Sequence, residues 1–110
     1  MKITPTKQDA LTILELEGRL DTLSANSLEK EISKILQRED CHLLIDCTGL
    51  DFVSSSGLRV LLATAKHMNR IKRKIALSSL QPKVKDVFDL AGFTMLFPIY
   101  GTKADGIAAF

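Results

Sequence analysis

Residues 51–58, Asp-Phe-Val-Ser-Ser-Ser-Gly-Leu, form the junction between an apolar run typical of a strand and a segment with helical periodicity. A serine just before periodic apolar residues indicates a helix start, because its side-chain oxygen accepts a hydrogen bond from a free N–H of the first turn. We therefore expect a serine exposed at the positive end of a helix, where an added anion is favoured by about 0.3–1 kcal/mol. Two interpretations remain open from these residues alone: a simple helix cap or a phosphate acceptor.

The segments on either side of this junction predict a strand and a helix. Residues 42–47 are apolar at almost successive positions, which is typical of a central parallel strand covered on both faces. After the serines, apolar residues recur at helical spacing and predict an amphipathic helix. They are Leu58, Leu61, Leu62, Ala65 and Met68.

The N-terminal part of the chain predicts two strands and a helix. Residues 2–5 indicate a short edge strand that ends at Pro5, and residues 14–20 alternate between apolar and polar, as in a strand with one buried face. The period then changes to that of a helix, with Ser24 as the expected N-cap. Its apolar positions are Leu28, Ile32, Ile35 and Leu36.

The C-terminal part predicts a strand, a helix and a last strand. A strand is expected at residues 75–77, reaching toward Leu80, and Pro82 suits the first turn of a helix that Gly92 ends. Residues 95–100 suggest an edge strand because Pro98 lacks an N–H. Residues 102–110 are expected to add one helical turn or to be mobile. The inward positions of the helix are expected to be Val84, Val87, Phe88 and Ala91.

This order of elements predicts one α/β domain over residues 1–110, with a mixed sheet of four to five strands packed with helices. In α/β folds, ligands bind at the carboxyl ends of parallel strands. The turn at residues 55–57 follows one such strand, and Asp21 ends another before a helix. Both groups could therefore share one rim of the sheet, although the sequence does not fix their separation.

Composition excludes several classes of protein. Fifteen Lys and Arg against thirteen Asp and Glu give a net charge of +2, too small and too mixed to indicate a nucleic-acid or membrane surface. Neither a span of ~20 apolar residues nor a signal peptide is present, so we expect a cytoplasmic protein. Cys41 and Cys47 are too far apart along one predicted strand to pair, which fits a reducing compartment.

The sequence gives no support for catalysis. The serines lack the first glycine of a G-x-S-x-G elbow, and phosphate-loop, dinucleotide and H-E-x-x-H zinc motifs are missing. We therefore expect no catalytic residue, no bound cofactor and no metal. A serine hydroxyl needs an adjacent base to act as a nucleophile. We therefore expect the serine site to be modified by another protein and not to catalyse a reaction itself.

Three segments together resemble the STAS-domain anti-sigma factor antagonists of bacteria. They are residues 18–21 (Gly-Arg-Leu-Asp), residues 51–62 and residues 84–93, and the likeness extends over nearly the whole chain. In that family a serine before a Ser/Thr/Ala-Gly pair is phosphorylated, which implies Ser55 as the acceptor. Family members often carry aspartate before the acceptor, whereas this chain has Ser54. Ser54 and Ser56 are therefore rival acceptors.

The resemblance also implies partners and a mechanism. The unphosphorylated protein would bind an anti-sigma factor that is also a serine kinase, and so release a sigma factor; phosphorylation of Ser55 would dissolve the complex, and a serine phosphatase would restore it. The implied contact residues are Asp21, Ser54, Ser56, Gly57 and Arg59. ATP and magnesium would belong to the kinase. The alternative is a STAS module that acts unphosphorylated, as a scaffold or sensor in a larger regulatory or transport assembly.

Overall fold

Five strands pair into one mixed sheet in the order β1-β2-β3-β4-β5 in the computed structural model, which describes residues 1–110. β1 is antiparallel to β2, and the remaining neighbours are parallel. The expected α/β class with a mixed sheet is confirmed. The strands are β1 (Lys2–Gln8), β2 (Leu11–Leu20), β3 (His42–Val53), β4 (Ile75–Ser78) and β5 (Ile99–Tyr100).

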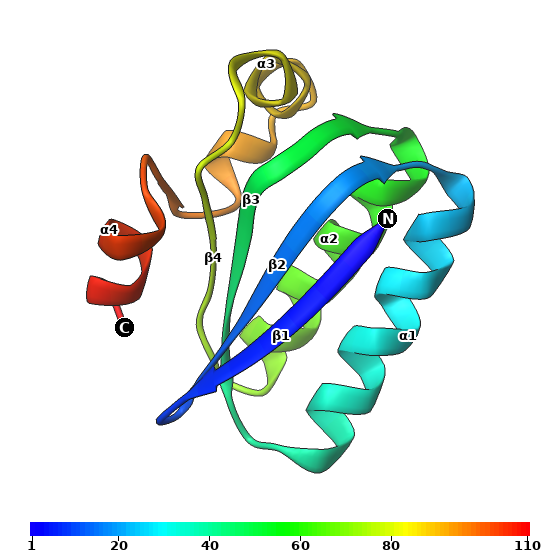
Figure 1. Ribbon diagram of the computed structural model, residues 1–110. Coiled ribbons are helices and arrows are strands. Elements are labelled where there is room, and N and C mark those ends of the chain that lie inside the picture. Colours follow the sequence, from blue (N-terminus) through cyan, green and yellow to red (C-terminus); the bar gives the residue numbers. More distant parts are fainter.

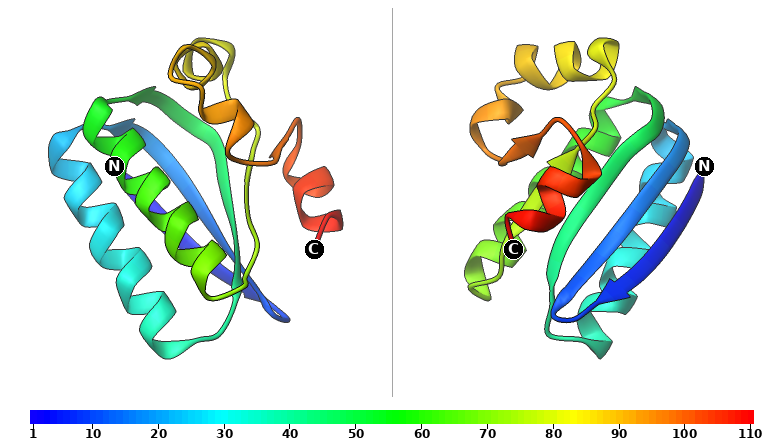
Figure 2. Two further views of the ribbon diagram at one scale, coloured as in Figure 1. Left: turned by 180° about the vertical axis from the view of Figure 1, so that it is seen from behind. Right: turned by 60° about the vertical axis from the view of Figure 1, so that its left-hand side comes forward.

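Two long helices, α1 (Thr22–Arg38) and α2 (Ser55–Arg70), lie side by side over one face of the sheet (Figures 1 and 2). α3 (Pro82–Leu90) lies beyond the carboxyl ends of the strands and leads into the 3₁₀ helix η1 (Phe93–Met95). The short α4 (Lys103–Ala108) packs against the opposite face of the sheet from α2 (Figure 2).

The core is divided by the alternation of side chains along the strands. In β3, Leu43 and Ile45 point into a cluster of 20 buried residues beneath the long helices, whereas Leu44 points to the other face. There a smaller cluster of four buried residues receives Ile107 and Phe110 from the C-terminal segment. β3 is therefore covered on both faces in this region, as its continuous apolar run predicts.

A charged contact also holds the C-terminal segment against the sheet. Lys103 Nζ donates to Glu15 Oε1 at 2.7 Å, and this carboxylate raises the pKa of Lys103. The last residues therefore form a docked helix, which resolves the two alternatives that the sequence leaves open for residues 102–110.

The first strand is longer than the sequence predicts. β1 continues through Pro5, which lies opposite Leu14, and ends only at Gln8. A residue without an N–H is tolerated because β1 is an edge strand, with a neighbour on one side only. The reversal takes place at Asp9, which has a positive φ of 55°.

The last strand is shorter than predicted, and the interpretation of residues 95–100 as a strand is wrong for its first half. Phe93–Met95 forms η1, and only Ile99–Tyr100 pairs with β4. Phe93 and Phe97 are buried, whereas Met95 and Leu96 face solvent, so the apolar run serves a loop that inserts two aromatic rings into the core. In α3, Val84 and Phe88 are buried as predicted, but Val87 and Ala91 are exposed. Gly92 ends the helix in a left-handed conformation, as expected.

Candidate partner-binding site

The predicted site residues meet at the carboxyl edge of β2 and β3. Leu20 and Val53, the last residues of these parallel strands, are register partners. The N–H of Ser54 donates to the carbonyl of Leu20 at 2.8 Å. Asp21 and Ser54 therefore begin adjacent helices from adjacent strand ends, and the structure brings the two predicted segments to one rim (Figure 1).

Asp21 is the N-cap of α1, which corrects the prediction that Ser24 fills this position. Asp21 Oδ1 accepts from the N–H of Ser24 at 3.0 Å, and Ser24 Oγ accepts from the N–H of Asp21 at 2.8 Å. The two residues form a capping box in which serine occupies the third helical position. Ser24 Oγ also donates to the carbonyl of Arg19 at 2.6 Å. The hydrogen bonds from Ser24, that from its backbone foremost, hold the pKa of Asp21 below its ordinary value.

The three serines occupy distinct positions at the start of α2. Ser54 is the N-cap, and its Oγ accepts from the N–H of Gly57 at 3.1 Å. Ser55 is the first helical residue and is exposed, whereas Ser56 is half-buried. The side chain of Ser54 is therefore committed to the helix end, and that of Ser55 is presented to solvent.

Gly57 sets the distance between α2 and the sheet. It is buried, and a Cβ atom at this position would lie 2.6 Å from Cγ of Leu20. A contact that short is not tolerated without a shift of the helix or of Leu20. Gly57 therefore allows the start of α2, which carries the serines, to approach the end of β2 closely.

Further side chains at this rim were not predicted as site residues. The guanidinium of Arg19 lies 4.0 Å from the centre of the Phe52 ring, a cation–π contact between register partners of β2 and β3. Phe52 is 36% exposed and Leu23, in the first turn of α1, is 80% exposed. The register of parallel strands would have indicated the first pair. Leu23 lies five residues before Leu28 and so falls outside the apolar stripe of α1, a signal that it faces solvent.

The predicted contact residue Arg59 lies one helical turn after Ser55. It is exposed and takes part in none of the four salt bridges of the structure. Residues four apart on a helix lie on the same face. A negative group on Ser55 would therefore meet both the free N–H groups of the helix start and the guanidinium of Arg59.

The two histidines lie away from the serine rim. His42 begins β3 and His67 lies near the end of α2, so neither provides a base beside the serines. No group of three or more His, Cys, Asp or Glu side chains is placed to hold a metal ion. No helix of this structure has both the length and the apolar character required to cross a bilayer.

Fold and rim together define a STAS domain. The chain belongs to this family, because the STAS family model matches residues 2–106. BtrV of Bordetella bronchiseptica, described as a candidate anti-sigma factor antagonist, is 34% identical over 110 residues, covering 100% of this chain and 95% of that protein. The predicted family is thereby confirmed. The names of these relatives are those of regulatory proteins, anti-sigma factor antagonists.

Solved structures show the same fold at lower identity. A candidate anti-sigma factor antagonist from Thermotoga maritima superposes with a TM-score of 0.92 at 19% identity, covering 97% of this chain and 92% of that chain. The anti-sigma factor antagonist SpoIIAA in its unphosphorylated form gives a TM-score of 0.86 at 18% identity, covering 98% and 95%. SpoIIAA of Bacillus is also known in its phosphorylated form, which gives 0.78 at 17% identity, covering 98% of both chains.

Proposed function

We propose that this protein is a cytoplasmic anti-sigma factor antagonist that works by partner switching. Its unphosphorylated form binds an anti-sigma factor with serine kinase activity and so releases a sigma factor. Phosphorylation of Ser55 ends that binding, and a serine phosphatase resets the protein. The observation that carries this proposal is the exposed Ser55 at the start of α2, beside Asp21 at the start of α1.

The geometry supports Ser55 over its neighbours as the acceptor. Ser54 Oγ is held by the N–H of Gly57, so a kinase would have to open the helix cap to reach it. Ser56 is half-buried, whereas Ser55 is exposed. A hydroxyl presented to solvent on a rigid helix end is the most accessible of the three to a kinase active site.

The surface around Ser55 suits a protein partner. Leu23 and Phe52 provide exposed apolar area, and Arg19, Asp21 and Arg59 provide charges of both signs. A phosphate on Ser55 would place roughly −1.5 to −2 charges in the middle of this surface. Because a buried charge without a partner costs several kcal/mol, phosphorylation would weaken binding to a surface that fits the free hydroxyl.

The relatives support the same function independently of the geometry. The 34% identity to BtrV extends over the full length of this chain and nearly the whole of that protein. SpoIIAA is known in both phosphorylation states, so a phosphorylated form exists for a protein of this fold. ATP and magnesium, which a kinase requires, would be bound by the partner.

A phosphorylation assay tests this function, with anti-sigma factors that are serine kinases from the organism in which the protein occurs. Each kinase is incubated with the protein, ATP and magnesium, and the product is analysed by intact mass and peptide mapping. We expect one phosphate, on Ser55, and none on a Ser55→Ala variant, which should still bind the kinase. Phosphate on Ser54 or Ser56 would overturn the assignment. Binding to a kinase without any phosphorylation would favour the scaffold or sensor alternative.

A further inference from the structure

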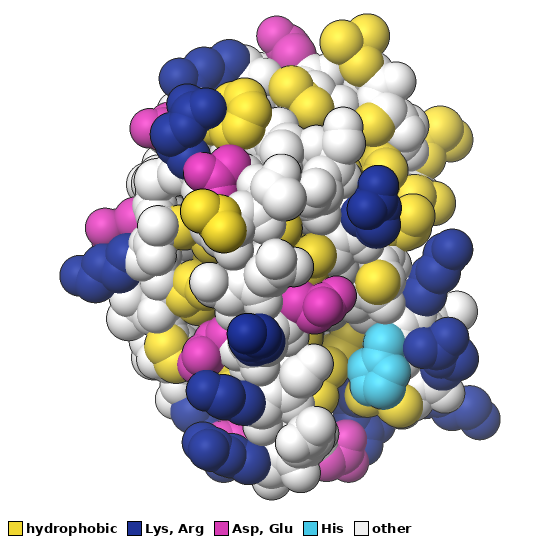
Figure 3. Space-filling model, turned by 90° about the vertical axis from the view of Figure 1, so that its right-hand side faces the viewer, with side chains coloured by type: hydrophobic (Ala, Val, Ile, Leu, Met, Phe, Trp, Pro, Cys, Tyr) yellow, Lys and Arg dark blue, Asp and Glu magenta, His cyan; other side chains and the backbone are white.

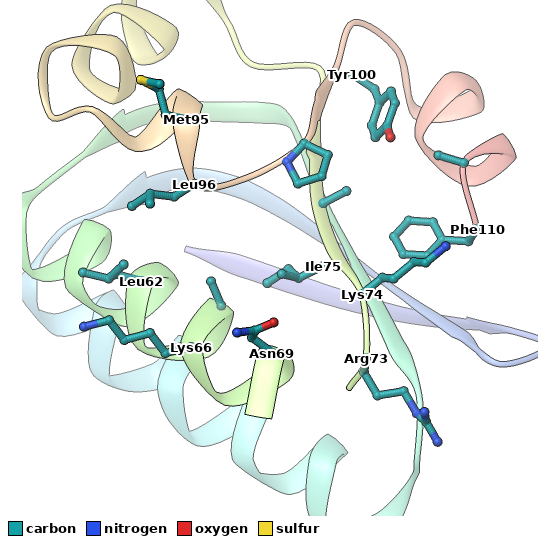
Figure 4. A pocket seen from close by; sticks show the side chains of 14 residues that line it. Leu62, Lys66, Asn69, Arg73, Lys74, Ile75, Met95, Leu96, Tyr100 and Phe110 are labelled. Atoms are coloured by element: carbon teal, nitrogen blue, oxygen red, sulfur yellow. The ribbon is translucent and has the colours of Figure 1, made fainter. Parts of the chain in front are cut away.

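A groove of about 520 Å³ lies between the second half of α2, strand β4 and the C-terminal segment, and none of the three serines lines it. Figure 4 shows Leu62, Lys66 and Asn69 along α2 on one side, Tyr100 and Phe110 on the other, and Ile75 between them. The lining residues of α2 run from Leu62 to Asn69, roughly 10 to 21 Å beyond Ser55 along the helix axis at 1.5 Å per residue. The groove therefore does not belong to the site around Ser55.

The groove exposes a free sheet edge. β5 pairs with β4 only at Leu77 and Ser78, so no strand covers the outer side of Ile75 and Ala76. The carbonyl of Lys74 accepts from Leu43 of β3, and the N–H of Leu77 donates to Pro98 on the outer side. Because successive residues of a strand point their backbone groups to opposite sides, the N–H and C=O of Ile75 point outward into the groove.

Apolar side chains flank this free edge on both faces of the sheet. Leu62 and Ala65 of α2 form one wall, and Tyr100 and Phe110 form the other. A peptide paired with β4 would direct its side chains alternately to these two walls. Met95 and Leu96 at the mouth are 90% and 53% exposed, which is unusual for large apolar residues.

The charges around the groove are of one sign. Lys66, Arg73 and Lys74 line it, and no acidic residue does. Arg73 forms an ion pair with Asp40 outside the groove, whereas neither lysine takes part in a salt bridge. The positive charge of the lysines is therefore available to a bound acidic group.

We propose that this groove binds an extended, acidic segment of a partner protein, which adds a strand to the free edge of β4. The backbone of Ile75 provides the pairing, the apolar walls receive alternate side chains, and Lys66 and Lys74 select acidic flanking residues. Lys74, the last residue of the basic run at residues 70–74, thereby acquires a role. Because the groove begins at Leu62, about two helical turns beyond Ser55, and does not include the serines, binding here is independent of phosphorylation.

The test uses a fluorescein-labelled heptapeptide with three central valines and two glutamates on each side, titrated into the full chain. We expect saturable binding with a Kd below about 1 mM. Amide signals of Ile75, Ala76 and the C-terminal segment should shift, and exchange of the Ile75 amide with solvent should slow. A Ser55→Asp variant should bind equally well. Lack of saturation, or shifts confined to the surroundings of Ser55, would overturn the proposal.

Two controls separate strand pairing from charge. Methylation of the valine nitrogens one at a time should weaken binding at least about tenfold at the position whose N–H faces Ile75, since it removes a ladder hydrogen bond. The double variant Lys66→Glu/Lys74→Glu should do the same, whereas Lys30→Glu/Lys34→Glu on the solvent face of α1 changes the net charge equally and should have little effect. Equal losses of peptide affinity in both double variants would show that the interaction depends only on net charge. If sedimentation shows a dimer in the absence of peptide, and the Ile75 amide is protected from exchange in that dimer, the occupant of the groove is a second copy of this chain instead.

Discussion

Asp21 is a candidate for both helix capping and partner recognition, and the sequence could not separate these two roles. The sequence places it at the end of a strand and suggests a role in recognition, with Ser24 as the cap. The structure shows that Asp21 itself caps α1 and that Ser24 completes the box. Both residues are plausible caps by type, and only the backbone geometry decides between them. A recognition role for Asp21 therefore has to be tested with substitutions that preserve the cap.

Replacing Asp21 with alanine should lower the free energy of unfolding by about 0.5–2 kcal/mol, because α1 loses the acceptor for the Ser24 N–H. Asp21→Asn should change stability little, since asparagine caps as well as aspartate. Urea unfolding of both variants gives these values. If Asp21→Asn also loses affinity for the anti-sigma factor kinase, the carboxylate acts in recognition; unchanged affinity would restrict Asp21 to capping.

The pH dependence of stability should carry a contribution from Asp21. Its folded-state pKa lies below the unfolded value of about 3.9, owing first to the hydrogen bond from the Ser24 backbone. The stabilisation is therefore fully present above pH ~4 and is lost as the pH falls through the folded pKa. In urea titrations the parent should lose more stability between pH 6 and pH 3 than Asp21→Asn does. Parallel curves would contradict this sign.

At the scale of elements, periodicity predicted the long helices and the central strand well. α1, α2 and β3 bury their apolar residues against one another, so local pattern and tertiary packing agree. The failures lie at the two edges of the sheet and around α3, where Val87 and Ala91 are exposed. Pro5 is tolerated within β1 because an edge strand has a free side. Residues 93–95 form η1, in which Phe93 is buried and Met95 is exposed, whereas a strand would place Phe93, Met95 and Phe97 on one face.

The close approach of α2 to β2 predicts that one added methyl group at Gly57 lowers the stability of the protein. Gly57→Ala should destabilise the protein by about 1–3 kcal/mol despite the higher helix propensity of alanine, because the new Cβ would meet Leu20. Gly101→Ala has no atom within 4 Å of its added Cβ and serves as the control. Thermal or urea unfolding measures both. A Gly57→Ala protein as stable as the parent would show that the contact relaxes freely.

At the scale of the whole molecule, phosphorylation of Ser55 should change binding without reshaping the domain. The phosphate would lie at the start of α2 and one turn before Arg59, where negative charge is favoured. The melting temperature should hold or rise slightly, and amide shifts should be confined to the surroundings of Asp21 and Ser55. Widespread shifts or a clearly lower melting temperature would instead indicate a conformational switch.

The sequence could predict the candidate site only in part. The order of segments located Asp21 and the serines, but the parallel register of Leu20 and Val53 brings them to one rim. The contact between Arg19 and Phe52 depends on the same register. Such features arise from tertiary structure and leave no local signal.

The most direct test of partner switching is the affinity of the anti-sigma factor kinase for the two forms of this protein. Protein with phosphoserine incorporated at position 55 and the unphosphorylated parent are titrated with the same kinase by calorimetry, without ATP. We predict that the phosphate weakens binding at least about tenfold, equivalent to 1.4 kcal/mol. Equal affinities for the two forms would contradict the proposed function.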